Sequence, residues 1–479
     1  MPPSQYLYDT EKTAPKDEPG FASDNDRSED RYDLEQVDTV RRGSFVSMQQ
    51  GSSYQTPGKW QTAVIFITNE VGIGILSLPA AMQTLGLIPG IIAIIGLGLV
   101  TTYTAYVLVQ FYRRYPTVMN IVDCCQIIGG KPLARITAIA FTLNLALTCA
   151  SACLTMSIAL NSMSDHALCT IAFIALPAIT SWALCLPRKF AFIAHCGIPC
   201  TVSIIAAVLI VMISLGIAER PQGALPGWER EIVLVGTPTF SQGMSACLNI
   251  AFAYAGNQGF VTVMAEMKNA ARDFTPALII LQSFAIPIYT IVAAVIYALA
   301  GQGVRSPALG SAPTLPAKIA YGILFPCLLG TSLVFAHTAI KYLFVVGLRF
   351  LRADSEYAKN TTRSWTLWIS IGTAFWFLSF IIANAVPVFD SILSISSAIF
   401  VAWFTFGISG VFWLFLNWDQ QGKGWRRICL AGVNWGIVVV TVFVNGAGMY
   451  AAVSGLLARF EDESQGVNGP FTCADNSIF

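Results

Sequence analysis

The feature that most constrains this chain is a series of long apolar segments that begins near Lys59. Each is long enough to cross about 30 Å of hydrocarbon as a helix. Helices suit such segments because every backbone polar group in lipid must find a partner within the protein. We count about eleven segments, and they predict an all-α integral membrane protein with about eleven transmembrane helices. The segments lie at approximately 60–83, 87–112, 133–160, 167–186, 190–217, 241–264, 275–300, 317–348, 365–386, 391–416 and 428–454.

Composition supports this class. The 479 residues are 55% hydrophobic and 11% charged, whereas soluble domains contain about 25% charged residues. The first 58 residues hold eleven acidic and six basic side chains with little apolar periodicity. We therefore predict a disordered acidic cytosolic tail at 1–58, a transmembrane domain at 59–457 and a short extracellular tail at 458–479. No basic patch indicates nucleic acid, so the expected surroundings are the lipid bilayer, with the oligomeric state left open.

Basic residues predict the orientation, because cytosolic loops carry an excess of Lys and Arg. With the N-terminus inside, fifteen Lys and Arg side chains fall in cytosolic loops and five on the outer side. An odd number of spans then places the C-terminus outside.

The twelve cysteines are expected to pack rather than to form a metal or disulfide framework. Cys149/Cys153 and Cys196/Cys200 are four residues apart inside apolar runs, and no C-x-x-C motif occurs.

The first span contains residues that weaken a helix. Glu70, Gly72, Gly74 and Pro79 lie within one apolar run. Gly costs roughly 1 kcal/mol against Ala in a helix interior, and Pro roughly 3. Irregular backbone at membrane depth survives only where it is buried in protein or lines a wet cavity. The stretch therefore predicts a broken span that binds something small and charged near the midplane. The alternative is a kinked span with small residues for close helix packing.

The sixth span has the same signature, because Gly256, Asn257, Gln258 and Gly259 interrupt its apolar run. Spans 1 and 6 open two successive sets of five spans. Paired discontinuous spans at matching positions of two halves indicate the binding site of a transporter.

These runs resemble a known family. VGIGILSLPAAMQTLG (71–86) is similar to the first-span motif of the amino acid/auxin permease family, within the amino acid–polyamine–organocation superfamily. FAYAGNQGF (252–260) and the residues from Met264 to Phe274 resemble the same family, apart from an extra Ala. The resemblance covers about 59–454 and is strongest to fungal neutral amino acid permeases, including the tail Pro470–Cys473. It implies a five-plus-five inverted repeat with discontinuous helices 1 and 6, an eleventh span, and transport of amino acids with a coupled cation.

Two sets of residues are predicted to bind substrate. Backbone amides at the start of a half-helix suit a carboxylate, and carbonyls of the second break suit an ammonium group. Phe252 and Tyr254 are candidates for the side-chain pocket, with plain packing as the alternative. Structural kinking is the alternative for the backbone positions. The set is Gly72, Ile73, Gly74, Ile75, Phe252, Ala253, Tyr254 and Gly256.

Four residues are candidates for ion coupling. A carboxylate inside a span costs several kcal/mol unless paired, hydrated or protonated, so Glu70 is a candidate proton-coupling group or partner for an ammonium, against a purely structural role. His195 on span 5 is a basic group of the kind that, in proton-coupled relatives, replaces a sodium ion. Thr331 and Ser332 on span 8 offer hydroxyls for sodium. Packing, or bonding to their own backbone, is the alternative for these three.

The sequence thus predicts a secondary active transporter, a proton-coupled symporter of neutral aliphatic or aromatic amino acids working by alternating access at the plasma membrane. No cofactor or metal is expected; H⁺ is the coupled ion and Na⁺ the alternative. The chain is not expected to be an enzyme, because three scattered histidines supply no metal-ligand set and no nucleophile–base pair occurs. A vacuolar exporter and a non-transporting nutrient receptor on the same scaffold are the remaining alternatives.

Overall fold

The computed structural model describes residues 58–188, 197–218, 220–222, 224, 228–353, 356–357, 359–461 and 469–476. The predicted tail at 1–58, apart from Gly58, and the candidate residue His195 lie outside the described residues. Within the described part every regular element is a helix, which confirms the predicted all-α class.

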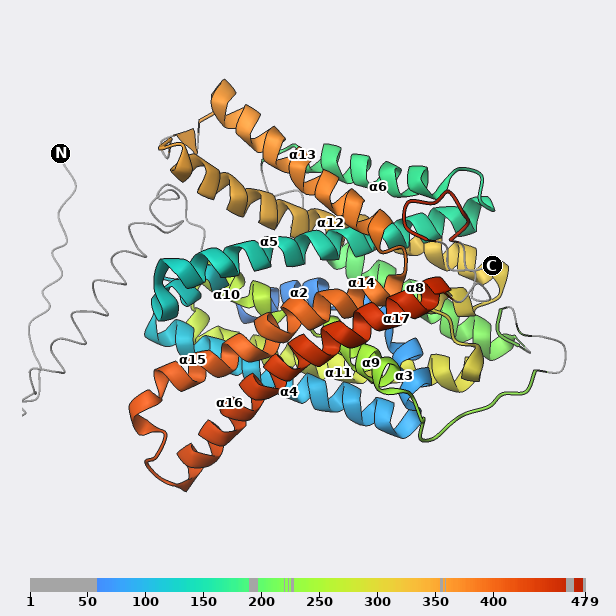
Figure 1. Ribbon diagram of the computed structural model, residues 1–479, viewed down its shortest axis with the longest axis horizontal. Coiled ribbons are helices and arrows are strands. Elements are labelled where there is room, and N and C mark those ends of the chain that lie inside the picture. Colours follow the sequence, from blue (N-terminus) through green and yellow to red (C-terminus); the bar gives the residue numbers. More distant parts are fainter. Residues whose placement is uncertain are drawn as a thin grey trace, which may run out of the picture.

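Eight helical stretches of this part are long and apolar enough to cross a membrane (Figure 1). Five of them are each a single element, namely α4, α5, α8, α12 and α13, which span Leu87–Arg114, Ile121–Ser164, Gly197–Ile217, Thr314–Phe350 and Thr362–Ala385. The stretch Ala270–Gly303 comprises α11 (Ala270–Ala300) and the short helix η3 (Gly301–Gly303).

The last two stretches each contain a π-helical segment. Phe389–Leu416 comprises α14 (Phe389–Ser396), η6 (Ser397–Gly407) and α15 (Ile408–Leu416). The final one comprises α16 (Trp425–Phe443), η8 (Val444–Gly448) and α17 (Met449–Glu461). A shorter apolar helix, α6, spans Thr170–Cys185. The short helices η4 and η7 span Ala308–Ser311 and Trp418–Gln420.

Two further units are broken in the middle. The first comprises α2 (Lys59–Glu70), η2 (Ile73–Leu76) and α3 (Leu78–Leu85), and the second comprises α9 (Phe240–Ala253) and α10 (Asn257–Glu266). Both breaks fall where the glycines interrupt the apolar runs, which confirms discontinuous helices 1 and 6. Because each piece is short, neither unit is among the eight long stretches. The exact number of about eleven crossings stays a prediction.

One boundary differs from the expected one. The third span was expected to begin at 133, but α5 begins at Ile121, where Asn120 accepts a hydrogen bond of 3.0 Å from the Asp123 amide. Gly130, with φ of 64°, leaves helical geometry two residues before Pro132. The residues from Ile121 to the bend at Gly130 therefore form a short helical arm, and the long membrane span follows after the bend.

The packing repeats between the two halves. The contact of α2 with α11 (spans 1 and 7) has its counterpart in that of α10 with α4 (spans 6 and 2). The contact of α8 with α12 (spans 5 and 8) matches that of α14 with α5 (spans 10 and 3), and the contact of α6 with α12 (spans 4 and 8) matches that of α13 with α5 (spans 9 and 3). In each pair, a span of one half is replaced by the span at the same position in the other half. Figure 1 shows α5, α6, α12 and α13 together on one side and α3, α4, α9 and α11 on the other. This is the packing that a five-plus-five repeat requires.

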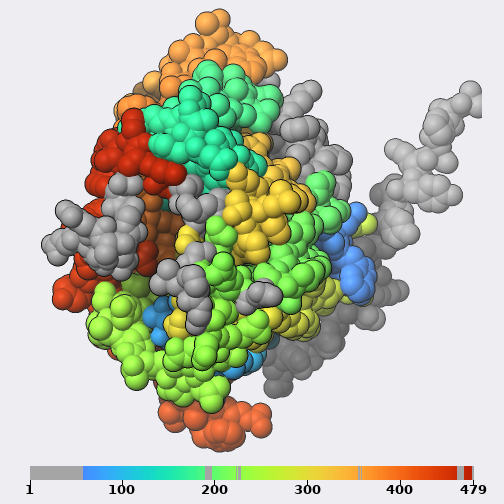
Figure 2. All heavy atoms as spheres, turned by 90° about the vertical axis from the view of Figure 1, so that its right-hand side faces the viewer, coloured from blue at the N-terminus to red at the C-terminus, as the bar shows by residue number. Residues whose placement is uncertain are grey.

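The end of α3 meets the segment that leads into α9. The Leu87 amide donates to the Val233 carbonyl (3.1 Å), and the Gly236 amide donates to the Leu85 carbonyl (2.9 Å). The first span therefore ends on the face of the molecule where the sixth begins, so the two halves run in opposite directions. The orientation predicted from the basic residues places this face outside, and we call it the outer face; it is turned towards the viewer in Figure 2.

Gly86 makes this junction possible. Its φ is 88°, and a Cβ on it would lie 2.4 Å from the Gly236 nitrogen. We expect Gly86→Ala to destabilise the protein by about 2 kcal/mol or more, through left-handed strain and this contact with backbone. Gly96→Ala on α4 is the control, because nothing lies within 4 Å of its added Cβ. The unfolding midpoint of the purified protein in detergent measures both, and equal midpoints for the two variants would contradict the prediction.

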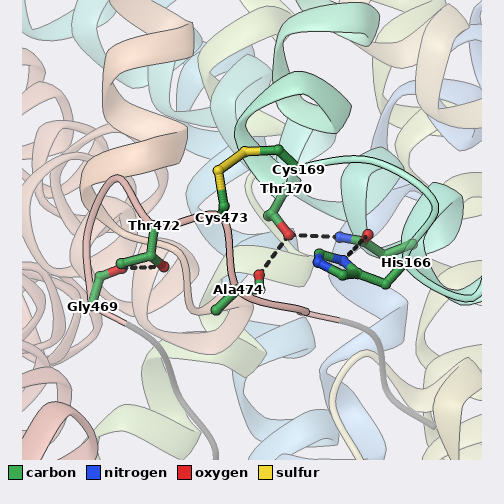
Figure 3. The surroundings of a disulfide bond; sticks show 8 residues. His166, Cys169, Thr170, Gly469, Thr472, Cys473 and Ala474 are labelled. Atoms are coloured by element: carbon green, nitrogen blue, oxygen red, sulfur yellow. Dashed lines mark hydrogen bonds between the residues drawn. A yellow bond between two sulfur atoms is a disulfide. The ribbon is translucent and has the colours of Figure 1, made fainter.

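The prediction that the cysteines only pack is wrong for two of them. Cys169 and Cys473 form a disulfide across 304 residues of sequence (Figure 3). Cys169 immediately precedes α6 and Cys473 lies in the C-terminal segment, and the predicted topology would place both outside, where disulfides persist. Seven of the nine free cysteines in the described part are buried helix residues, as expected.

Candidate functional site

The break in the first unit leaves backbone groups without helical partners. α2 ends at Glu70, Gly72 has φ −136° and ψ −143°, and a 3₁₀ turn follows at Ile73–Leu76. The first amides of a helix or 3₁₀ turn have no carbonyl acceptor within that element, because no residue of the element precedes them by a full turn. Ser77 closes the turn by donating from its hydroxyl to the Gly74 carbonyl (2.9 Å). The amides of Gly72 and Ile75 already bond the carbonyls of Glu70 and Gly72 (2.9 and 3.2 Å), so within the described residues the break leaves the amides of Ile73 and Gly74 for a ligand. Substrate binding by the four predicted residues stays a prediction.

The break in the second unit frees carbonyls. α9 ends at Ala253, and Tyr254–Gly256 form a turn before α10. The Ala255 amide bonds the Phe252 carbonyl at 3.1 Å, one residue short of the α-helical pattern. The carbonyl of Ala253 instead lies 3.0 Å from the hydroxyl of Tyr289 on α11.

The two breaks lie directly against each other. A Cβ on Gly74 would lie 2.5 Å from the Cα of Ala253, so these backbones are in contact. The Tyr289 hydroxyl lies 2.8 Å from the Glu70 carbonyl as well as near that of Ala253, and so bridges the breaks. A Cβ on Gly72 would meet only the Thr331 methyl, at 3.9 Å. The structure therefore brings both predicted backbone sets and Thr331 together.

Glu70 lies at the centre of this arrangement. Its Oε1 accepts a hydrogen bond of 3.2 Å from the Gln282 side chain on α11. Its Oε2 is buried and has no hydrogen-bond partner within the described part of the chain. A Cβ on Gly256 would lie 2.6 Å from this oxygen, so Oε2 faces the break in the second unit. Glu70 is only 6% exposed, so its carboxylate is buried inside the protein in this conformation.

The two predicted hydroxyls point in different directions. Thr331 faces Gly72 across the first break. Ser332 donates to the Leu329 carbonyl (2.8 Å), and its Oγ lies 3.5 Å from that of Ser181 on α6. The structure thus places Thr331 beside the first break and Ser332 in the packing between α12 and α6.

The two predicted aromatic residues are both buried. The Tyr254 ring packs edge-on against Tyr289, with centroids 5.2 Å apart, and its hydroxyl lies close to Gly98 on α4. Tyr254 therefore packs towards α4 and α11. Phe252 is 8% exposed and completes the last turn of α9.

A polar cluster beyond the predicted residues ties the second break to its neighbours. The Asn257 side chain donates to the Thr104 hydroxyl (2.9 Å) and to the Thr405 carbonyl (3.0 Å). The Gln258 side chain accepts from Asn144, which in turn accepts from Ser396 at 2.9 Å. Asn257 and Gln258 were noted only as helix breakers in the sequence. Their spacing could not reveal partners on α4, α5, α14 and η6.

A cavity of about 970 Å³ lies between these breaks and the outer face. Its walls include Ala81 on α3, Asn249 on α9 and Ser394 on α14. Asn249 precedes Ala253 by four residues, about 6 Å along a helix. The cavity therefore ends about one helical turn from the second break, and its lining includes none of the eight predicted substrate-binding residues.

Comparison with known proteins agrees with this architecture. Residues 56–454 match the family described as transmembrane amino acid transporter protein. The chain is 30% identical to the N amino acid transport system protein of Neurospora crassa, over 89% of this chain and 90% of that protein. It is 26% identical to a transmembrane transporter of Gibberella moniliformis, over 91% of this chain and 92% of the other.

A solved structure shares the fold. The manganese transporter of Eremococcus coleocola superposes with a TM-score of 0.50 at 13% sequence identity, covering 85% of this chain and 90% of that one. At this identity the match speaks for the fold alone.

Proposed function

The chain belongs to the transmembrane amino acid transporter protein family, and from that premise we propose that it is a proton-coupled symporter of neutral amino acids. The family is one of membrane transporters and not of enzymes, so that part of the sequence prediction is confirmed. The multi-pass membrane location is confirmed as well. The ion, the substrate range, the symport direction and the plasma membrane are our proposal.

The observation that carries the proposal is the buried Oε2 of Glu70, which has no partner in the described part of the chain. An ionised carboxylate held this way is unfavourable by several kcal/mol. Binding a proton removes the charge, and binding a cationic group compensates it. Because Glu70 ends α2 and faces Gly256 at the second break, either event acts where the two broken units meet.

The substrate would bind at the same place. Amides at the start of η2 would bind its carboxylate, and carbonyls near Ala253 would bind its ammonium group. The contact between Gly74 and Ala253 leaves no room for substrate between these two residues. We therefore place the substrate beside them, on the inner side of Asn249, where the outer cavity ends.

Uptake in cells that lack their own permeases tests the function. We expect labelled neutral amino acids to accumulate faster at about pH 5 than at about pH 7, without sodium, and to acidify the cytosol as a proton enters with each molecule. A sodium requirement would contradict proton coupling and favour a cation near Gly72 and Thr331. No uptake of any amino acid by protein shown to be at the surface would favour the nutrient receptor. A fluorescent fusion found in the vacuolar membrane would favour the exporter.

A further inference from the structure

The C-terminal segment Gly469–Asn476 is fastened to the outer ends of α5 and α6. The disulfide Cys169–Cys473 is one attachment (Figure 3). The Thr170 hydroxyl donates to the Ala474 carbonyl at 2.6 Å. The Asn476 amide donates to the Ser157 hydroxyl at 3.3 Å. Figure 2 shows this red segment against the teal connection between α5 and α6.

The segment also reaches the other helices around the cavity. The Phe471 amide donates to the carbonyl of Asn384 at the end of α13 (3.2 Å). Along the chain the segment follows α17, which packs on α9 and α14. Alternating access is largely the movement of one helix group against another around a fixed site. The segment therefore connects α5, α6 and α13 to the group that contains the broken unit α9–α10.

The same segment forms a wall of the outer cavity. Phe471, Thr472 and Asn476 line it together with Gln83 on α3 and Gln242 on α9. A solute that moves from the outer face towards the breaks through this cavity passes these residues.

Phe471 is the unusual residue of this wall. It is 49% exposed, although burial is the ordinary state of a Phe side chain. Its φ is 55°, a left-handed conformation that is rare for a bulky residue and persists only where the surroundings enforce it. The disulfide two residues later and the bond to Asn384 provide that enforcement. The turn at Pro470 and Phe471, closed by the Thr472 hydroxyl on the Gly469 carbonyl (3.0 Å), fits this backbone conformation and leaves an exposed aromatic ring in the cavity wall.

We propose that the disulfide-held segment is part of the substrate's entry path, and that Phe471 selects for amino acids with large apolar side chains as they pass. This rests on the proposed function, because the ring must meet an amino acid on its way in. Its flat apolar face suits aliphatic and aromatic side chains, and the fixed backbone keeps it in the path. Small amino acids would pass without contacting it.

Uptake of labelled phenylalanine and labelled alanine tests the proposal in Phe471→Ala, in the double variant Cys169→Ser/Cys473→Ser and in Phe350→Ala. Phe350 is 87% exposed at the far end of α12 and serves as the matched control. We expect the ratio of KM for phenylalanine to KM for alanine to rise by about threefold or more in Phe471→Ala. We expect the double variant to move in the same direction and Phe350→Ala to keep the wild-type ratio.

Surface abundance is measured in parallel, and Phe471→Ala retains the disulfide, so a misfolded double variant leaves the test intact. An unchanged ratio in Phe471→Ala, or an equal change of KM for both substrates, would overturn the proposal while leaving amino acid transport in place. Absence of uptake by the wild-type protein at the surface would overturn the proposed function and this selection together.

Discussion

Gly74→Ala is expected to reduce amino acid uptake about a hundredfold or more, since a displacement of about 1 Å at a binding site has effects of that size. The added Cβ would lie 2.5 Å from the Cα and 3.1 Å from the nitrogen of Ala253. These are backbone atoms that cannot rotate away, so the two broken units must separate. Separation moves the amides of η2 away from the carbonyls of the second break, which together form the proposed substrate site.

Two other glycines make this prediction specific. Gly72→Ala adds a methyl that meets only the Thr331 side chain at 3.9 Å, and Gly96→Ala adds one with nothing within 4 Å. We expect reduced but measurable uptake for Gly72→Ala and wild-type uptake for Gly96→Ala. Surface biotinylation normalises the rates. Near-normal transport by Gly74→Ala would mean that the two breaks do not touch in the working protein.

The contrast between Gly72 and Gly74 shows which features of the site cannot be predicted from the sequence. Both glycines interrupt an apolar run and were predicted alike, because a helix break is a local property of the residues that form it. Which of them touches another backbone depends on Ala253, about 180 residues away in the chain. No local pattern carries that information, so the existence of the breaks was predictable and their contact was not.

Partners on other helices were missed for the same reason. Gln282 and Tyr289 bind Glu70 and the two breaks from α11, yet that span was predicted only as an apolar crossing. A signal was present, because residues seven apart lie on one face of a helix and both carry polar atoms. The disulfide gave no such signal, because its cysteines are 304 residues apart and neither belongs to a spaced motif.

Glu70→Gln is expected to abolish the coupling of uptake to the proton gradient while leaving exchange of substrate across the membrane. The glutamine carbonyl can still accept the hydrogen bond that Gln282 donates to Oε1, and the side chain keeps its size beside Gly256. The variant therefore preserves the structural role of the residue and removes only its ability to ionise. With one proton per substrate and an inward difference of about two pH units, coupling can sustain about hundredfold accumulation, because each unit is worth 1.36 kcal/mol. In Glu70→Gln the accumulation ratio should fall towards one.

Accumulation and counterflow together distinguish the roles of this carboxylate. If Glu70 carries the proton, the variant loses pH dependence and accumulation but retains counterflow of labelled substrate into preloaded cells. If Glu70 instead binds the substrate ammonium, the variant raises KM for every amino acid and keeps its dependence on pH. Glu70→Ala is a useful third variant, because it leaves the buried Gln282 amide without its acceptor and should lower surface abundance, an effect of about 1 to 3 kcal/mol on stability. Normal pH-driven accumulation by Glu70→Gln would exclude Glu70 as the proton site, and would leave the orphaned Oε2 as a feature of packing between the two broken units.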